Sequence, residues 1–283
     1  MTDELSSRVR ADYSRVRFKA FLNNVWTSLS GQPNRLLSYD DVKEKLHIGG
    51  PIYRGVQTVR VDQIAGSLNR YHQFDRAFLP TQDDTSERWQ SINRAFYQDV
   101  SLPPVVLYKV GQVYFVVDGH HRVSVAREQG QEFIDAEVRE CATRVNITPT
   151  LKPEDLEILE DKVHFLERSG LDQLRPGVNI KLTIPDGFDR MLEHIAVHRY
   201  FMGLDQKRDI SEQEAVTDWY DTVYSPIVKI IRESEIIKEF PGKTEGDLYL
   251  WVLDHQHYLA QSEGQPLQPP EEAARGFIED HEP

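Results

Sequence analysis

The sequence has one cysteine, no long apolar run and no internal repeat. Cys141 has no partner within the chain, so an internal disulfide is excluded, and its place at the end of a predicted strand favours a packing role. No apolar run reaches the ~18 residues of a membrane span, and no segment has the apolar core of a secretory signal. These absences predict a reduced, cytoplasmic protein with no membrane partner.

The net charge of −13 is unevenly distributed along the 283 residues. Residues 1–150 hold 19 Lys and Arg against 18 Asp and Glu, which gives +1, whereas residues 151–283 hold 14 against 28, which gives −14. A strongly acidic region repels nucleic-acid phosphates at physiological salt. Extensive nucleic-acid binding is therefore excluded for the second half and left open for the first.

The first half mixes helix and strand signals. Apolar residues at helical spacing predict a helix over 8–27, and its cations, Arg8, Arg10, Arg15, Arg17 and Lys19, suit either a solvated face or a DNA contact. A helix is also expected over 86–98. The β-rich runs at 58–61, 104–110, 112–117 and 133–141 predict strands.

The second half is mostly helical in its pattern. Capping residues and periodicity predict helices over 151–169, 188–202, 215–233 and 248–261, and a short apolar run at 180–184 fits a strand. The tail from residue 263 is rich in Pro and Glu, which is typical of a flexible arm.

The segment Asp118-Gly119-His120-His121-Arg122 follows an apolar strand and opens a helix. Free N–H groups and the positive end of the helix dipole favour an anion at such a position, and arginine adds a forked donor suited to phosphate. Asp118 beside bound phosphates can hold Mg²⁺. The pattern therefore predicts a phosphate chain, most simply that of a nucleotide.

Histidine patterns offer a metal alternative with less support. Adjacent histidines point apart on a helix, so a zinc site at His120 and His121 needs ligands from elsewhere. His194 and His198 are four residues apart, but the order EHIAVH lacks the interior acid of a zinc protease motif. We interpret His194 and His198 as core-edge or surface residues.

Residues 105–138 resemble the core of the ParB N-terminal/sulfiredoxin superfamily, whose strand–turn–helix box binds nucleotide phosphates. Gly119, His120, His121 and Arg122 fill that box, and Asp118 matches the version found in free-serine kinases. Residues 59–70 resemble the first box of the family. The resemblance implies that Gly66, Ser67 and Arg70 lie near the same phosphates, with ATP, ADP or CTP as the nucleotide and Mg²⁺ as its ion.

Departures from the family restrict the activity. The catalytic cysteine of sulfiredoxins falls on His120, so that chemistry is not expected. The kinases place a glutamate where this chain has Ser67-Leu68-Asn69, which leaves Asp75 and Glu87 as candidate bases. The histidines replace the ParB box residues, so CTP specificity is not carried over.

The sequence predicts an α+β protein: a basic helical extension (1–55), a ParB/sulfiredoxin-like nucleotide-binding domain (56–145), a mostly helical acidic domain (151–262) and a flexible tail (263–283). Two functions remain open. One is a nucleotide-binding regulator that contacts DNA through its N-terminal half or forms a homodimer. The other is a nucleotide-dependent phosphotransferase resembling free-serine kinase.

Overall fold

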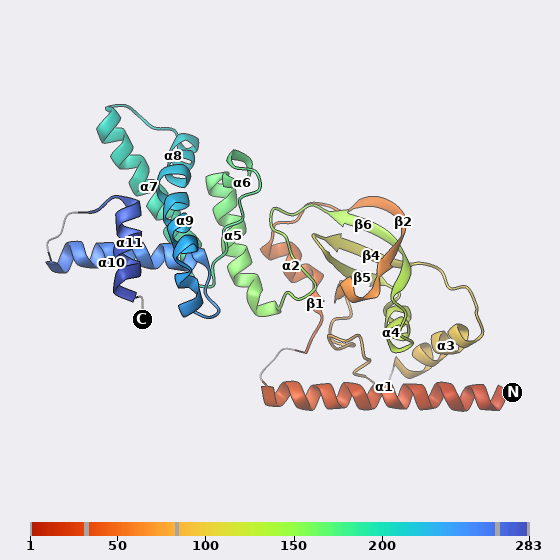
Figure 1. Cartoon of the computed structure of the whole chain (residues 1–283). Coiled ribbons are helices and arrows are strands. Elements are labelled where there is room, and N and C mark those ends of the chain that lie inside the picture. Colours follow the sequence, from red (N-terminus) through yellow and green to blue (C-terminus); the bar gives the residue numbers. More distant parts are fainter. Residues whose placement is uncertain (1, 31–33, 83–84, 264–266, 282–283) are drawn as a thin grey trace. The chain divides into compact units, whose positions relative to one another are not determined.

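A computed structural model describes residues 2–30, 34–82, 85–263 and 267–281 (Figure 1). The chain divides into two compact units, Met1–Leu156 and Glu157–Pro283. The predicted boundary at 55–56 falls inside strand β2, so the N-terminal extension and the nucleotide-binding domain share one unit.

The first unit is built on a mixed six-stranded sheet. Its strands are β1 (Leu37–Ser38), β2 (Ile52–Arg60), β3 (Ile64–Ser67), β4 (Val105–Val110), β5 (Val113–Asp118) and β6 (Phe133–Cys141), in the order β1-β3-β5-β4-β6-β2. β3 runs parallel to β1 and β5. β4 and β5, which match the predicted strands at 104–110 and 112–117, form an antiparallel hairpin around Gly111. The α+β prediction is confirmed.

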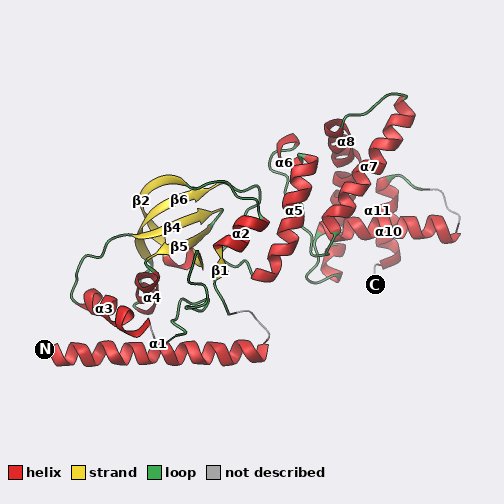
Figure 2. Cartoon of the chain, turned by 180° about the vertical axis from the view of Figure 1, so that it is seen from behind, coloured by secondary structure: helices red, strands yellow, loops and turns green. Residues whose placement is uncertain are grey.

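Four helices complete this unit: α1 (Thr2–Ser30), α2 (Tyr39–Lys45), α3 (Ser86–Tyr97) and α4 (His120–Glu128). Ser38 caps α2 by accepting the Asp41 N–H at 3.2 Å. α4 and α3 lie between the sheet and α1 (Figure 2). One apolar cluster joins the sheet to α4, and a second, around Trp89 and Val16, joins α1, α3 and α4.

Helices are the only regular secondary structure among the described residues of the second unit. Its α-helices are α5 (Leu156–Ser169), α6 (Leu171–Leu174), α7 (Gly187–Gln206), α8 (Glu212–Trp219), α9 (Ser225–Ser234), α10 (Glu245–Glu263) and α11 (Pro270–His281). A π-turn at Tyr220–Tyr224 separates α8 from α9 within the predicted helix 215–233. Pro226 explains this interruption, because proline has no N–H and clashes with the carbonyl four residues earlier.

The expectation of a strand at 180–184 is wrong. Thr183 donates its N–H to Asp247 Oδ1 at 2.8 Å, and Thr244 Oγ1 donates to the Lys181 carbonyl at 2.6 Å. The start of α10 therefore uses backbone groups that a strand would need for pairing.

The tail does not form a loose arm over residues 270–281. This segment is α11, which buries Ala273, Ala274, Phe277 and Ile278 and packs on α9 and α10. The segment contains many acidic residues, so its composition alone does not reveal this short apolar face. Residues 264–266 and 282–283 of the predicted tail lie outside the described residues.

Candidate functional site

The parallel strands β3 and β5 bring both predicted boxes to one edge of the sheet. Ser67 at the end of β3 is paired with Val116, two residues before the end of β5. Because both strands run the same way, the turn after Ser67 and the turn at Gly119 meet at their carboxyl ends.

Gly119 makes the turn into α4 and has φ +100°. A side chain there is strained, and a Cβ would lie 2.6 Å from Val105 Cγ1. His120, His121 and Arg122 form the first turn, whose N–H groups have no acceptor within the helix. The structure thus places an anion-attracting helix start where the sequence predicts one.

A cavity of about 700 Å³ opens at this helix start. Its walls come from the turn after β3, the beginning of α3 and the β5–α4 junction, and consist of Asn69, Arg70, Gln73, Thr85, Arg88, Ile92, Val117, Asp118, Gly119, His120, His121 and Arg122. Three arginines face one carboxylate among these described residues. The cavity is therefore polar and positively charged.

The three arginines are held differently. Arg70 and Arg88 are exposed, and neither makes an ion pair with any residue that the structure describes. Arg122 is 13% exposed; it pairs with Asp118 at 2.6 Å and donates to the carbonyls of Pro103 and Pro104, at 2.9 Å to the latter. Arg70 and Arg88 are thus available to an anion, whereas Arg122 fixes the loop before β4.

His120 is buried and linked to the first box. Its Nε2 lies 2.8 Å from Ser67 Oγ, which also accepts the Arg70 N–H at 3.0 Å, and its ring stacks on Phe74. Burial, with a smaller contribution from Arg70, lowers the pKa of His120 to about 4. His120 is therefore a neutral group that positions the Ser67 turn and, through it, Arg70.

Gly66 serves packing. A Cβ at this position would lie 2.1 Å from Phe115 Cδ1, so only glycine allows β3 to pass the Phe115 ring. Neither Gly66 nor Ser67 lines the cavity. Ser67 contacts the wall residue His120, but Gly66 and Ser67 are not themselves part of the wall.

The structure does not place the candidate bases in the cavity. The Asp75 carboxylate is buried and accepts the N–H groups of Ala77 and Leu79 at 2.9 and 2.8 Å and the Asn23 amide at 3.1 Å. Burial raises the pKa of Asp75. Glu87 is exposed on α3 and is not part of the cavity wall. Asp75 organises its own loop, and Glu87 has no contact with the site.

No cluster of three or more metal-ligating side chains occurs among the described residues. The zinc alternative therefore has no ligand set around His120 and His121 in that part of the chain. Asp118, 73% exposed, offers one carboxylate at the mouth of the cavity. A single carboxylate suits Mg²⁺ only when phosphate oxygens and water complete its octahedron.

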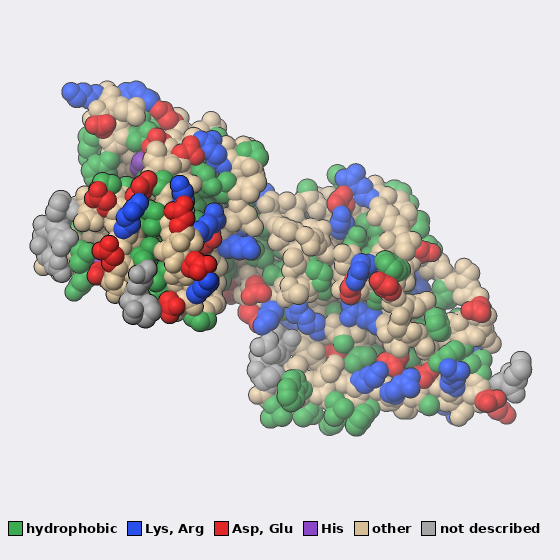
Figure 3. Space-filling model, in the orientation of Figure 1, with side chains coloured by type: hydrophobic (Ala, Val, Ile, Leu, Met, Phe, Trp, Pro, Cys, Tyr) green, Lys and Arg blue, Asp and Glu red, His purple; other side chains and the backbone are tan. Residues whose placement is uncertain are grey.

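The basic residues of α1 are largely used within the first unit. Arg15 and Lys19 pair with Glu128 at 2.9 and 2.8 Å, Arg17 donates to the Pro80 carbonyl, and Arg8 stacks on the Tyr97 ring. Acidic side chains lie among the basic ones over the visible face of this helix (Figure 3). These contacts favour the structural interpretation of the basic helix over a DNA contact.

Sequence reasoning missed four polar wall residues: Asn69, Gln73, Thr85 and Arg88. Arg88 lies in the first turn of α3. The sequence signal that could have identified it was the start of this second helix, since the start of α4 was already the predicted anion site. Thr85 also contacts α1, since its Oγ1 lies 3.3 Å from Tyr13 Oη.

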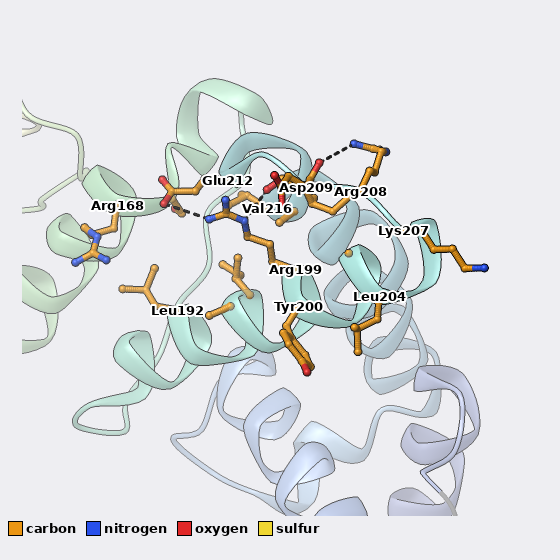
Figure 4. Close-up of a pocket in the computed structure, with 16 residues that line it drawn as sticks. Arg168, Leu192, Arg199, Tyr200, Leu204, Lys207, Arg208, Asp209, Glu212 and Val216 are labelled. Atoms are coloured by element: carbon orange, nitrogen blue, oxygen red, sulfur yellow. Dashed lines mark hydrogen bonds and ion pairs between the residues drawn. The ribbon is translucent and has the colours of Figure 1, made fainter.

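A second cavity of about 850 Å³ lies in the C-terminal unit (Figure 4). Leu192, Ile195 and Val216 contribute apolar wall, and four cations, Arg168, Arg199, Lys207 and Arg208, lie around it. Arg199 is 3.4 Å from Glu212 and Arg208 pairs with Glu214, while Lys207 extends away from the other labelled side chains. Glutamates therefore neutralise Arg199 and Arg208, whereas Arg168 and Lys207 have no ion pair with a residue that the structure describes.

The histidines of the second unit form hydrogen bonds and hold no metal cluster in the described chain. His194 Nδ1 lies 3.1 Å from Tyr249 Oη, and His198 Nε2 lies 2.7 Å from Asp218 Oδ2. Burial lowers the pKa of His194 to about 4. Both are structural, as their spacing indicates.

None of the described helices combines the length and apolar character needed to cross a membrane.

Comparisons with known proteins point to the first unit. No curated protein matches the chain. Two solved structures are similar. The first is a Pnob8-like ParB-N domain, with 11% identity over 82% of this chain and 83% of that chain and a TM-score of 0.23. The second is a C-terminally truncated chromosome-partitioning protein ParB from Caulobacter crescentus complexed with CTP-γ-S, with 12% identity over 80% of this chain and 99% of that chain and a TM-score of 0.24. Both TM-scores are low. The ParB N-terminal domain family matches residues 53–152, which span β2 to β6 and the whole cavity wall. Residues 53–152 are therefore similar to the ParB N-terminal domain family, as the sequence resemblance predicts.

Proposed function

We propose that this protein binds the phosphate chain of a nucleotide in the cavity at the start of α4. The match to the ParB N-terminal domain supports this assignment, and the cavity volume of about 700 Å³ suits a ligand of that size. The N–H groups of the α4 first turn supply the phosphate-binding backbone.

The observation that carries the proposal is the arrangement of Arg70 and Arg88. They reach the cavity from two different elements and have no ion pair in the described chain. Unpaired cations gathered in one concave site repel each other, so an anion between them stabilises the arrangement. A triphosphate supplies several negative charges for these cations.

Mg²⁺ fits as a partner of the nucleotide. Asp118 Oδ2 contacts Arg122, and the other carboxylate oxygen would be available to hold the ion. When bound, Mg²⁺ would neutralise phosphate charge. Asp118 would orient it, directly or through water.

A regulatory role is favoured over phosphotransfer. Asp118 is the one carboxylate in the described cavity wall, and its Oδ2 already pairs with Arg122. Asp75 is occupied by three hydrogen bonds and Glu87 lies outside the cavity, so neither reaches a bound hydroxyl. We infer a ParB-like nucleotide-responsive module, with DNA association of the first unit expected through surfaces other than the α1 cations.

Isothermal titration calorimetry with ATP, ADP and CTP, each with and without Mg²⁺, tests the proposal. We expect at least one nucleotide to bind, and Arg88→Ala to weaken it by about ten-fold, because one charge-assisted contact is lost. Arg94→Ala is the matched control: Arg94 lies on the same helix but not in the cavity wall.

Three outcomes would contradict the assignment: no nucleotide binds the wild type, Arg88→Ala binds as well as wild type, or Arg94→Ala weakens binding equally. Incubation of γ-labelled ATP with free serine then separates the two functions. Transfer of label to serine would refute the purely regulatory role.

A further inference from the structure

The helix α1 has two apolar faces on opposite sides. Its buried face, Val9, Tyr13, Val16 and Ala20, packs in the cluster with α3 and α4. Its outer face consists of Phe18, Phe21, Leu22, Val25, Trp26 and Leu29, which are 42–81% exposed. At about 100° per residue, the outer face is centred roughly opposite Ala20. Hydrophobic side chains gather along the lower edge of α1 in Figure 3, toward its C-terminal end.

The outer face has the spacing of a helix–helix seam. Phe18, Leu22, Val25 and Leu29 follow one another at intervals of four, three and four residues, the alternation of a coiled-coil core. The other face of the helix already supplies its contacts to the first unit, so these side chains add nothing to the folding of that unit. A contiguous apolar patch of this size marks an interaction surface.

The charges on and around the outer face favour self-association. Residues 20–30 contain no charged side chain, and Lys19 at its border is paired with Glu128. A surface helix that binds an anionic membrane carries Lys and Arg along its polar face, whereas Asn24 and Ser28 occupy that position here. Residues 1–150 carry a net charge of +1, so two copies approach through this half with little repulsion.

The area of the outer face is sufficient for a dimer. Three aromatic side chains of ~150–250 Å² each, together with two leucines and a valine, offer roughly 700 Å² per copy at their exposed fractions. A standard interface buries about 800 Å² per partner. We propose that the outer face of α1 pairs with the same face of a second copy of this chain, which makes α1 an isologous dimer interface. This pairing is independent of nucleotide.

Sedimentation equilibrium of the full-length protein over a concentration series tests the pairing. We expect a dimer for wild type and an increase of at least about ten-fold in its dissociation constant for Leu22→Glu/Val25→Glu, because two carboxylates replace apolar contacts in the seam. Asn24→Glu adds a like charge to the same helix away from the seam and should leave the dimer intact. Circular dichroism checks that each variant retains its helix content.

Cysteine cross-linking gives a second readout. Cys141 is buried, so a single introduced thiol is the accessible one among the described residues. Mild oxidation should cross-link dimers of Leu22→Cys or Leu29→Cys. If the two helices are antiparallel and cross near Leu22, only Leu22→Cys should be cross-linked. Asn24→Cys should not be cross-linked in either case. A wild-type monomer at the highest concentration, a dimer that survives Leu22→Glu/Val25→Glu, or a monomer that instead binds phosphatidylcholine vesicles through this face would overturn the proposal.

Discussion

The two cavities of the molecule contain similar residue types but differ in the backbone elements that surround their cations. Around the C-terminal cavity, Arg199 and Arg208 pair with glutamates of the following segment. In the N-terminal cavity, Arg70 and Arg88 have no such partner within the described chain, although the surrounding half of the sequence is nearly neutral. Arg168 and Lys207 of the C-terminal cavity likewise have no ion pair within the described chain, so ion pairing alone does not separate the two cavities. The start of α4 lies beside Arg70 and Arg88, and this helix start makes the N-terminal cavity the candidate anion site.

The largest effect is expected from the glycines that line the two cavities. Gly119→Ala forces a side chain into φ +100° and against Val105, which should destabilise the first unit by about 3 kcal/mol or more. Gly203→Ala in α7 has its nearest neighbour at 3.3 Å and a helical backbone, so we expect a change within about 1 kcal/mol. Urea unfolding curves measure both. Equal losses in the free energy of unfolding would show that both cavities need glycine at these positions to the same degree.

A fall in pH should lower the folding stability of both units. The pKa values of His120 and His194 are lowered to about 4 from an unfolded value of 6.5, so the unfolded chain binds more protons between these values. The stability from each histidine is present above pH 6.5 and is lost as the pH falls toward 4, by up to about 3 kcal/mol each.

Hydrogen exchange at several pH values separates the two contributions. His120→Gln should remove the acid sensitivity of the first unit and His194→Gln that of the second. If His120→Gln changes exchange in residues 157–283 instead, the two units do not unfold separately.

The smallest effect concerns the basic residues of α1. Lys19→Ala removes one ion pair of the buried Glu128 carboxylate and should lower the stability of the first unit by up to ~1 kcal/mol, since Lys19 itself is half exposed. Arg10→Ala is the control, because the one hydrogen bond of its side chain to a described residue is with the Ser6 carbonyl. A DNA shift assay across a salt series should give the same slope for both variants and wild type. If Arg10→Ala reduces the slope of log affinity against log salt concentration by about one, α1 contacts DNA phosphates instead.

Local signals predicted the elements well and the site in part. Strand β5, the turn at Gly119 and helix α4 follow from a β-rich run, a glycine and a periodic segment that are adjacent in sequence. Arg88 was missed because it reaches the cavity only through the packing of α3. Asp75 was proposed as a base because of its position along the chain, and its burial by Asn23 and the Leu79 backbone depends on contacts that no local pattern reports.

The sequence by itself determined that residues 118–122 form a helix start suited to an anion, because backbone geometry and residue type act within one turn. It also determined the separation of an acidic helical half from a nearly neutral mixed half. Tertiary structure alone decided that Arg70 and Arg88 line one cavity at that helix start, that His120 is neutral and that one side of α1 is left uncovered by the described residues of its unit. Burial and charge pairing arise from residues far apart in the chain, so their energies are fixed only after the elements have packed.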